Sequence, residues 1–95
     1  MALLSDAEIG EGLSGLEGWE RSGDAIAKTF SCADFVGSVR FVESLVGPAE
    51  EMNHHPDLAI SWSEVTVTIS THSEGGLTAA DFELAAKVDA LSPTS

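Results

Sequence analysis

The sequence has 95 residues, of which 43% are hydrophobic and 21% charged, a composition that is ordinary for a globular protein. Sixteen acidic and four basic residues give a formal net charge of −12, so the surface should repel nucleic-acid phosphates and anionic lipid. We therefore expect one domain over residues 1–95, whose ligand is neutral, cationic or another protein, with no direct contact to nucleic acid or membrane.

The cellular compartment is suggested by two further features. Residues 1–6 lack the basic segment and apolar run of a signal peptide, and no apolar run in the chain has the length of a membrane span. Cys32 has no second cysteine to pair with, which agrees with a reducing compartment. A cytoplasmic protein is expected.

Three segments share a pattern that is typical of the first turn of a helix. In each, a Ser or Thr is followed three residues later by an acidic residue, and apolar side chains flank the pair. The three segments are Leu4–Ile9, Phe30–Phe35 and Leu77–Phe82. We predict a helix at each of them. The first ends near residues 10–12 or continues to Leu16, and the third runs from about Ala79 to Leu91.

The second predicted helix has apolar residues spaced by three and four positions, as on one face of a helix. These residues are Phe35, Val39, Val42, Val46 and Ala49. Gly47-Pro48 interrupts the pattern, because a proline inside a helix loses one hydrogen bond and clashes with the preceding turn. We predict a kink at this dipeptide, after which the helix resumes towards Met52.

Two pairs of strands are predicted between the helices. Trp19–Arg21 and Ala25–Phe30 flank Ser22-Gly23-Asp24, which is a turn signal. Residues 58–62 alternate between apolar and smaller side chains, which places Trp62 in the core or in a pocket wall. Residues 65–71 alternate strictly, so His72 belongs to the polar face of that strand.

The predicted elements follow the order α-β-β-α-β-β-α. Runs of paired strands between helices favour an α+β fold over a parallel α/β fold. We expect a two-layer sandwich in which a four-stranded antiparallel sheet carries its helices on one face.

The three histidines all lie where a predicted element ends. His54 and His55 precede Pro56, which disfavours the helical conformation for His55 and should end the second helix there. His72 follows the last strand. Imidazole titrates near neutral pH, so these side chains are candidates for acid/base chemistry. Structural roles stay open for each one, since a histidine at a helix end can bond the last carbonyls.

Two acidic residues can be associated with the histidines. Glu50 lies four positions before His54, so an uninterrupted helix would let its carboxylate orient that imidazole, although a solvated surface role is also open. Asp81 is accounted for by helix capping, because Asp34 holds the equivalent position in the second predicted helix with no histidine nearby in sequence. Zinc is a weak alternative, since the spacing matches no common zinc motif, and we predict no metal site.

A series of residues in this chain resembles the signature of the pterin-4a-carbinolamine dehydratase family. The series is Glu50-Glu51-Met52-Asn53-His54-His55-Pro56, then Trp62, then Thr71-His72, then Gly76-Leu77-Thr78 with Asp81. The resemblance extends over most of the chain, from the Leu-Ser-x-x-Glu-Ile start and Gly18-Trp19 to the last helix. Gly47-Pro48 departs from the family pattern.

This resemblance implies an activity and a site. The activity is dehydration of 4a-hydroxytetrahydrobiopterin to quinonoid dihydropterin, in the recycling of the pterin that an aromatic amino acid hydroxylase uses. The implied acid/base residues are His54, His55 and His72, and which one gives and which one takes a proton stays open. Residues implied to bind or orient the substrate are Glu50, Pro56, Trp62, Thr71 and Asp81. No cofactor is implied.

The resemblance also implies partners. Family members associate by pairing the edges of their sheets, so a homodimer or homotetramer is expected. The alternative function is a non-enzymatic protein-binding module on the same fold, either an assembly factor or a transcriptional dimerisation cofactor.

Overall fold

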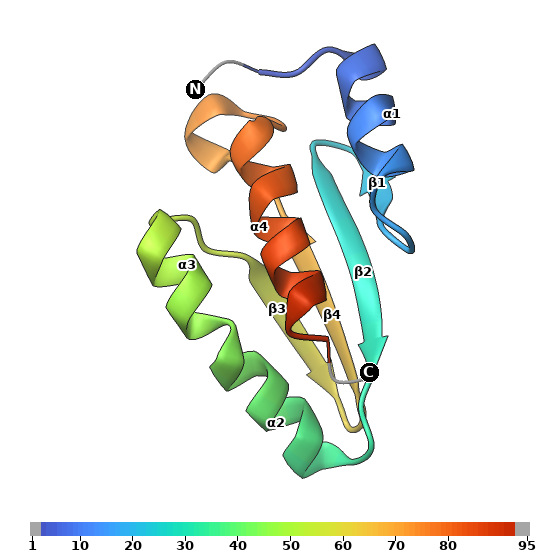
Figure 1. Ribbon diagram of the computed structural model, residues 1–95, viewed down its shortest axis with the longest axis vertical. Helices are drawn as coiled ribbons and strands as arrows, with labels where there is room; N and C mark the ends of the chain where they lie inside the picture. The colour runs from blue at the N-terminus through green and yellow to red at the C-terminus, as the bar shows by residue number, and fades with distance from the viewer. Residues whose placement is uncertain (1–2, 93–95) are drawn as a thin grey trace.

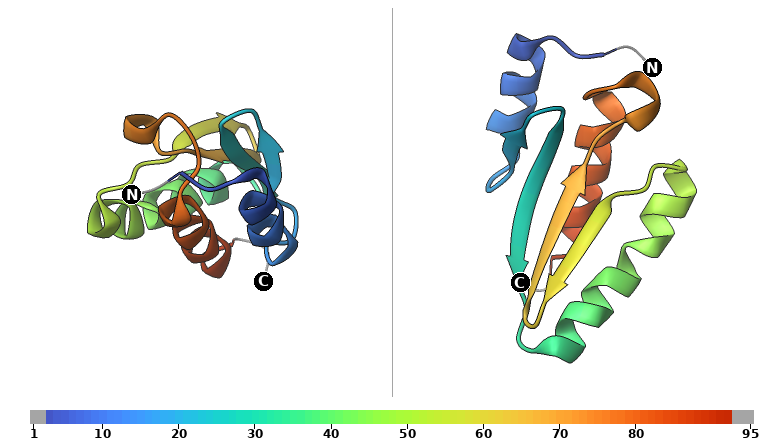
Figure 2. Two further views of the ribbon diagram at one scale, coloured as in Figure 1. Left: turned by 90° about the horizontal axis from the view of Figure 1, so that it is seen from above. Right: turned by 180° about the vertical axis from the view of Figure 1, so that it is seen from behind.

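The computed structural model describes residues 3–92, and within them four strands form one antiparallel sheet (Figure 1). The strands are β1 (Glu20–Ser22), β2 (Ala25–Ser31), β3 (Asp57–Ser61) and β4 (Glu64–Ile69), in the spatial order β1-β2-β4-β3. The helices are α1 (Asp6–Ser14), α2 (Phe35–Ser44), α3 (Val46–Met52) and α4 (Ala79–Ala90), and a 3-10 turn, η1 (His72–Glu74), precedes α4. The helices gather on one side of the sheet (Figure 2), so the predicted α+β architecture is confirmed.

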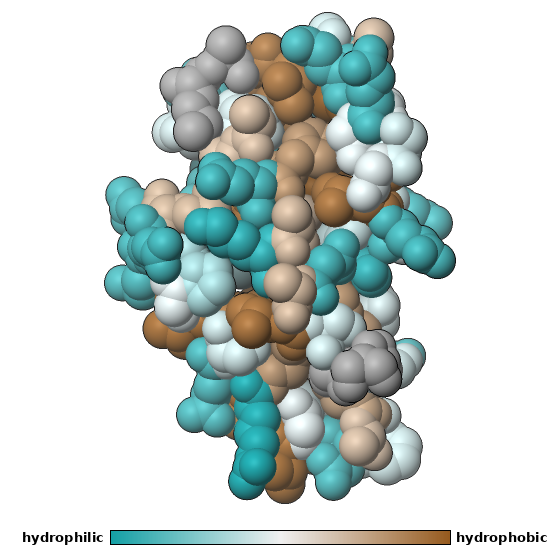
Figure 3. Space-filling view, in the orientation of Figure 1, coloured by the Kyte–Doolittle hydropathy of each residue, from teal (hydrophilic) through white to brown (hydrophobic). Residues whose placement is uncertain are grey.

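The core lies between the sheet and the helices. Alternation along β4 turns Val65, Val67 and Ile69 inward, and all three side chains are fully buried. They pack with residues of β2 and α4, among them Ile26 and Leu84. The face that carries α4 is hydrophilic over much of its surface, with separate apolar areas between the polar groups (Figure 3).

Local capping chemistry starts α1 and α4 where it was predicted. Ser5 Oγ accepts the Glu8 N–H at 3.2 Å, and a Glu8 carboxylate oxygen accepts the Ser5 N–H at 2.9 Å. At α4, a carboxylate oxygen of Asp81 accepts the Thr78 N–H at 2.8 Å. Each exchange satisfies backbone donors that the helix itself cannot pair, so both predicted capping boxes are confirmed.

The predicted capping box of the second helix is wrong. Ser31 is not a helix cap but the last residue of β2, where it pairs with Glu64 of β4. Asp34 is the N-cap itself, and its Oδ1 accepts the Gly37 N–H at 2.7 Å. Because sheet pairing holds Ser31 extended, the helix begins later and Asp34 is not equivalent to Asp81.

The break in the second helix falls earlier than the predicted kink at Gly47-Pro48. Leu45 separates α2 from α3, and Pro48 lies in the first turn of α3. Proline has no N–H to donate to the carbonyl of Ser44 and its ring crowds that carbonyl, so the regular helix ends there. In the first turn of α3 the missing N–H costs nothing.

The apolar stripe predicted for this helix does not face the core as a whole. The buried residues are Ser38, Phe41, Leu45 and Ala49, of which only Ala49 belongs to the predicted stripe. Phe41 packs on Phe30 with ring centroids 4.9 Å apart. By contrast Phe35 and Val46 are 55% and 58% exposed. The helix has apolar residues on two faces, and the spacing of these residues alone does not say which face is buried.

Trp62 was predicted to lie in the core or in a pocket wall, and this prediction is wrong. Its side chain is 74% exposed, and its φ of 53° places it in the turn between β3 and β4. Ser61 pairs with Glu64, so Trp62 and Ser63 form a two-residue hairpin loop. The strand alternation ends before Trp62.

None of the helices within residues 3–92 has the length and apolar character that crossing a membrane requires.

Candidate acid/base site

The backbone turns sharply just before the paired histidines. Helix α3 ends at Met52, and Asn53 adopts the left-handed conformation, with φ 50° and ψ 44°. The His54 N–H donates to the Ala49 carbonyl at 3.0 Å, which closes the helix end. The chain then runs without helical structure to β3, so His54 and His55 contact different parts of the protein.

His54 lies against Asp81 at the start of α4. Its Nε2 is 2.6 Å from Asp81 Oδ1, and the His54 side chain is only 14% exposed. Asp81 is completely buried. Its other oxygen, Oδ2, accepts the Thr71 hydroxyl at 2.9 Å in addition to the Thr78 N–H.

Helix capping is therefore only half of the role of Asp81. The sequence-based view that capping alone accounts for this residue is wrong, because its two oxygens have separate tasks. Oδ2 holds the helix start, whereas Oδ1 is directed at His54. Asp34 has no such second contact among the described residues; its carboxylate accepts only the Gly37 N–H.

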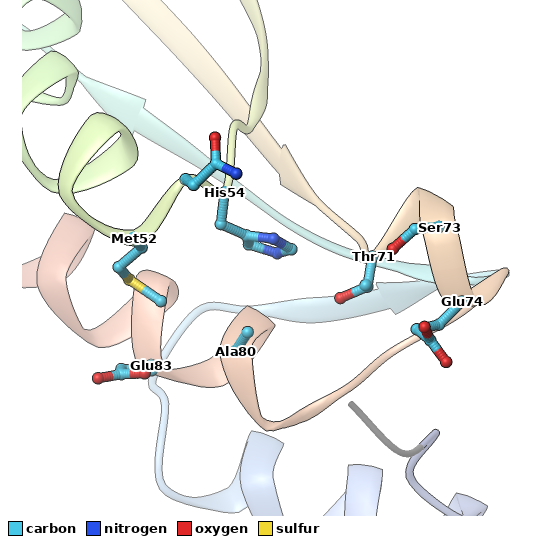
Figure 4. Close-up of a pocket in the computed structure, with 8 residues that line it drawn as sticks. Met52, His54, Thr71, Ser73, Glu74, Ala80 and Glu83 are labelled. Atoms are coloured by element: carbon cyan, nitrogen blue, oxygen red, sulfur yellow. The ribbon is translucent and has the colours of Figure 1, made fainter.

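A cavity of about 310 Å³ opens beside this pair, with the His54 ring between the end of α3 and the η1 turn (Figure 4). Its lining residues are Met52, Asn53, His54, Thr71, Ser73, Glu74, Ala80 and Glu83. Of these, only His54 and Thr71 were predicted to be site residues. Ser73 and Glu74 follow His72 before Gly75, and this turn position is the signal that could have drawn attention to them.

His55 forms a second histidine–carboxylate pair. Its Nε2 is 2.5 Å from Glu50 Oε2, and the two side chains are 56% and 67% exposed. The predicted partnership of Glu50 with His54 is wrong, since the left-handed Asn53 takes His54 off the helix on which that spacing rests. Glu50, His55 and Pro56 line a smaller cavity of about 170 Å³, whose other walls are mainly apolar residues of α2, α3 and β3.

The remaining predicted site residues are not in either cavity. His72 opens the η1 turn with its side chain 74% exposed, 3.8 Å from Asp57 Oδ2 and 3.4 Å from Ser70 Oγ. Pro56 precedes β3 and Trp62 follows it, so these two residues lie at opposite ends of the strand. The structure thus brings together His54, Thr71 and Asp81, pairs His55 with Glu50 separately, and leaves Trp62 away from both.

The chemistry offered by these groups is proton transfer. Imidazole can give or take a proton near neutral pH, and a carboxylate beside it can orient the ring and stabilise its charged form. Within residues 3–92, no group of three or more His, Cys, Asp or Glu side chains is placed to hold a metal ion.

An α+β sheet that carries a buried histidine–carboxylate pair beside a cavity defines a candidate acid/base protein, and comparison with known proteins supplies the family. Residues 2–91 match the family model described as "Pterin 4 alpha carbinolamine dehydratase". The chain belongs to this family. The resemblance found in the sequence is confirmed.

Relatives of similar length carry the same name. A protein of Thermosynechococcus vestitus is 51% identical over 86% of each chain, and one of Roseiflexus castenholzii is 50% identical over 93% of this chain and 95% of its own. Both are named as proposed pterin-4-alpha-carbinolamine dehydratases. These relatives support a dehydratase.

Solved structures with this fold have more than one described role. A transcriptional coactivator/pterin dehydratase from Brucella melitensis superposes with a TM-score of 0.91 at 33% identity, over 96% of this chain and 99% of its own. A pterin dehydratase-like protein, described as a RuBisCO assembly factor in the alpha-carboxysome, gives a TM-score of 0.68 at 26% identity, over 83% and 94% of the two chains.

Proposed function

We propose that this protein dehydrates 4a-hydroxytetrahydrobiopterin to quinonoid dihydropterin and water. The proposal depends on the position of His54. Its imidazole lines the 310 Å³ cavity, and its Nε2 is hydrogen-bonded to the buried carboxylate of Asp81. A histidine oriented by a carboxylate at a cavity wall is the arrangement that general acid/base catalysis uses. Family membership supplies the substrate class.

The reaction needs one proton removed and one supplied. The proton on ring nitrogen N5 leaves, and the N5 electrons form a double bond to C4a as the C4a–oxygen bond breaks. The departing hydroxyl takes a proton and leaves as water. Two positioned groups that titrate near neutral pH can perform both transfers, and no cofactor enters the balance.

The cavity agrees with the proposal in size and charge. A volume of about 310 Å³ lies at the lower end of the range for small-molecule sites. The substrate carries no phosphate, so the net charge of −12 does not oppose its approach. Glu50, His55 and the exposed His72 belong to the proposed site as further acid/base or orienting groups, with Thr71 holding Asp81.

Stopped-flow absorbance tests this function directly. Chemically prepared 4a-hydroxytetrahydrobiopterin decays slowly in buffer, and added protein should accelerate the decay and the appearance of quinonoid dihydropterin in proportion to its concentration. A rate equal to that in buffer would refute the proposed enzyme.

The proposed role also implies a cytoplasmic protein that acts after an aromatic amino acid hydroxylase.

Self-association is part of the proposal. Strand β3 lies at an edge of the sheet with all five of its residues exposed, and Leu58 and Ile60 remain 39% and 41% exposed. An open strand with apolar side chains is a template for pairing with another strand. Size-exclusion chromatography with light scattering should therefore give the molar mass of a homodimer or a homotetramer. Ile60→Lys should shift it towards monomer, whereas Ser22→Lys on the opposite edge strand should not.

The second candidate function is a protein-binding module on the same fold. Phe35, Val36 and Val46 project from α2 and α3 with more than half of each side chain exposed, which suits a protein interface. The RuBisCO assembly factor of similar fold gives a precedent. An inactive protein that nevertheless binds a partner through these residues would favour this alternative.

A further inference from the structure

We propose that Asp81, Thr71 and Thr78 hold His54 in a single tautomer, with the proton on Nε2, so that His54 exchanges protons with a ligand only through Nδ1. The tautomer follows from the hydrogen bonds of the resting protein. Its use in catalysis rests on the proposed function.

The two oxygens of Asp81 have different hydrogen-bond partners. Oδ2 is occupied by two donors, the Thr78 N–H at 2.8 Å and the Thr71 hydroxyl at 2.9 Å. Asp81 is completely buried, and a carboxylate is tolerated in the interior when hydrogen-bond donors satisfy its oxygens. An ionised carboxylate can only accept, so the 2.6 Å contact of Oδ1 requires an N–H on His54 Nε2.

The hydrogen bonds of Thr71 and Thr78 can run in only one direction. Each hydroxyl has one proton, and Thr71 gives its proton to Asp81. Thr71 Oγ1 is also 2.9 Å from Thr78 Oγ1, so in this second bond Thr71 must accept and Thr78 must donate. The chain of donors runs from Thr78 through Thr71 to Asp81, and it fixes which carboxylate oxygen remains for His54.

The other ring nitrogen of His54, Nδ1, is left for a ligand. Within residues 3–92, no hydrogen bond engages Nδ1 of His54, and no fully buried side-chain nitrogen or oxygen lacks a partner. Nδ1 is therefore accessible, and His54 lines the 310 Å³ cavity. In a neutral imidazole with Nε2–H, the lone pair is on Nδ1, so this atom can accept a proton but cannot give one.

These steps assign a role within the proposed reaction. In this role, Nδ1 of a neutral His54 takes the proton from N5 of the pterin while the N5=C4a bond forms and the C4a–oxygen bond breaks. The resulting imidazolium keeps its Nε2–H on the Asp81 carboxylate, which stabilises the charge without becoming protonated. The acid that protonates the departing hydroxyl is a separate group. Asp81, Thr71 and Thr78 are positioning residues because they act through His54.

Nitrogen NMR of uniformly ¹⁵N-labelled protein tests the tautomer without substrate. At a pH where His54 is neutral, long-range ¹H–¹⁵N correlation should show a pyrrole-type nitrogen at Nε2 and a pyridine-type nitrogen at Nδ1. The wild-type spectrum is decisive by itself. The reverse pattern, or a mixture averaged over both tautomers, would overturn the proposal.

Asp81→Asn tests whether Asp81 determines the tautomer of His54. The same two donors should hold the amide oxygen in the place of Oδ2, so the amide NH₂ faces His54 and donates to Nε2. The two nitrogen signals should then exchange types, giving the Nδ1–H tautomer. A folded variant that keeps Nε2–H would refute the role of Asp81. Glu50→Gln is the matched control, since it makes the same change at the partner of His55 and should leave the His54 pattern as in wild type.

The outcome separates the two proposals. If the protein fails to accelerate pterin dehydration but shows Nε2–H at His54, the proposed function fails and the assigned tautomer stands. If it accelerates dehydration but shows Nδ1–H, the function stands and the assignment is wrong.

Discussion

Nε2 of His54 and Oδ1 of Asp81 lie 2.6 Å apart, although the two residues are separated by 27 positions in the chain. His54 is placed by the left-handed end of α3, and Asp81 by the capped start of α4. The positive end of the α4 dipole favours a carboxylate at that place. The pair therefore exists because two helix termini meet, and both termini are specified by local sequence.

Asp81→Asn should abolish most of the activity while leaving a folded protein. The loss expected for a mispositioned general base is about 10²- to 10⁴-fold in kcat, with a smaller effect on KM, because substrate binding does not depend on the tautomer. Steady-state or single-turnover decay of the carbinolamine measures it. Asp34→Asn is a matched control, since it alters a capping carboxylate of α2 and should cost stability only. Equal activity in both variants would contradict the assignment.

Thr71→Val should lower the free energy of unfolding by about 1–3 kcal/mol, because the buried Asp81 carboxylate loses a donor that the valine cannot replace. Thr71→Ser keeps the hydroxyl and should recover most of this stability. Urea denaturation followed by circular dichroism gives both values. If Ser and Val variants are equally stable, the hydroxyl has no part in holding Asp81.

Two phenylalanines of α2 should respond differently to truncation. Phe41→Ala removes a buried ring that packs on Phe30 and should cost about 3–5 kcal/mol. Phe35→Ala removes an exposed ring from the same helix and should change the stability of the monomer by no more than about 0.5 kcal/mol. Denaturant midpoints at low protein concentration compare them. Similar costs would mean that the buried face of α2 is assigned incorrectly.

The capping box of α1 predicts one pH effect. Hydrogen bonds from the Ser5 backbone and side chain hold the pKa of Glu8 below its ordinary value of 4.5. A carboxyl whose pKa is lower in the folded state stabilises the protein above the unfolded pKa, and this contribution disappears as the pH falls through the folded pKa. The difference in melting temperature between wild type and Glu8→Gln should therefore shrink on acidification below 4.5. A difference that stays constant as the pH falls through this range would contradict the account.

Local chemistry in the sequence was sufficient to predict much of the fold. The Ser5 and Thr78 capping boxes and the alternation along β4 are short-range signals, and each produced the expected element. Two predictions on the second helix were wrong because they needed tertiary information. Its true N-cap depends on how far β2 extends, and its buried face depends on where Phe30 lies.

The site was predictable in its residue types but not in its pairings. The family resemblance named His54, His55, Thr71 and Asp81, yet the chain spacing suggested that Glu50 belonged to His54. The left-handed conformation of Asn53 reverses this, since it directs the two histidines to different carboxylates. Ser73, Glu74 and Glu83 also line the cavity. The turn after His72 is a signal for the first two, whereas no sequence pattern singles out Glu83.

We propose that His54, held by Asp81, makes this protein a pterin-4a-carbinolamine dehydratase. The most direct measurement is the decay rate of 4a-hydroxytetrahydrobiopterin with wild type and with His54→Ala at equal concentration, after circular dichroism has shown both to be folded. The wild type should accelerate the decay, and His54→Ala should reduce that acceleration by about 10²- to 10⁴-fold. Decay at the buffer rate with wild type, or an unchanged rate with His54→Ala, would contradict the claim.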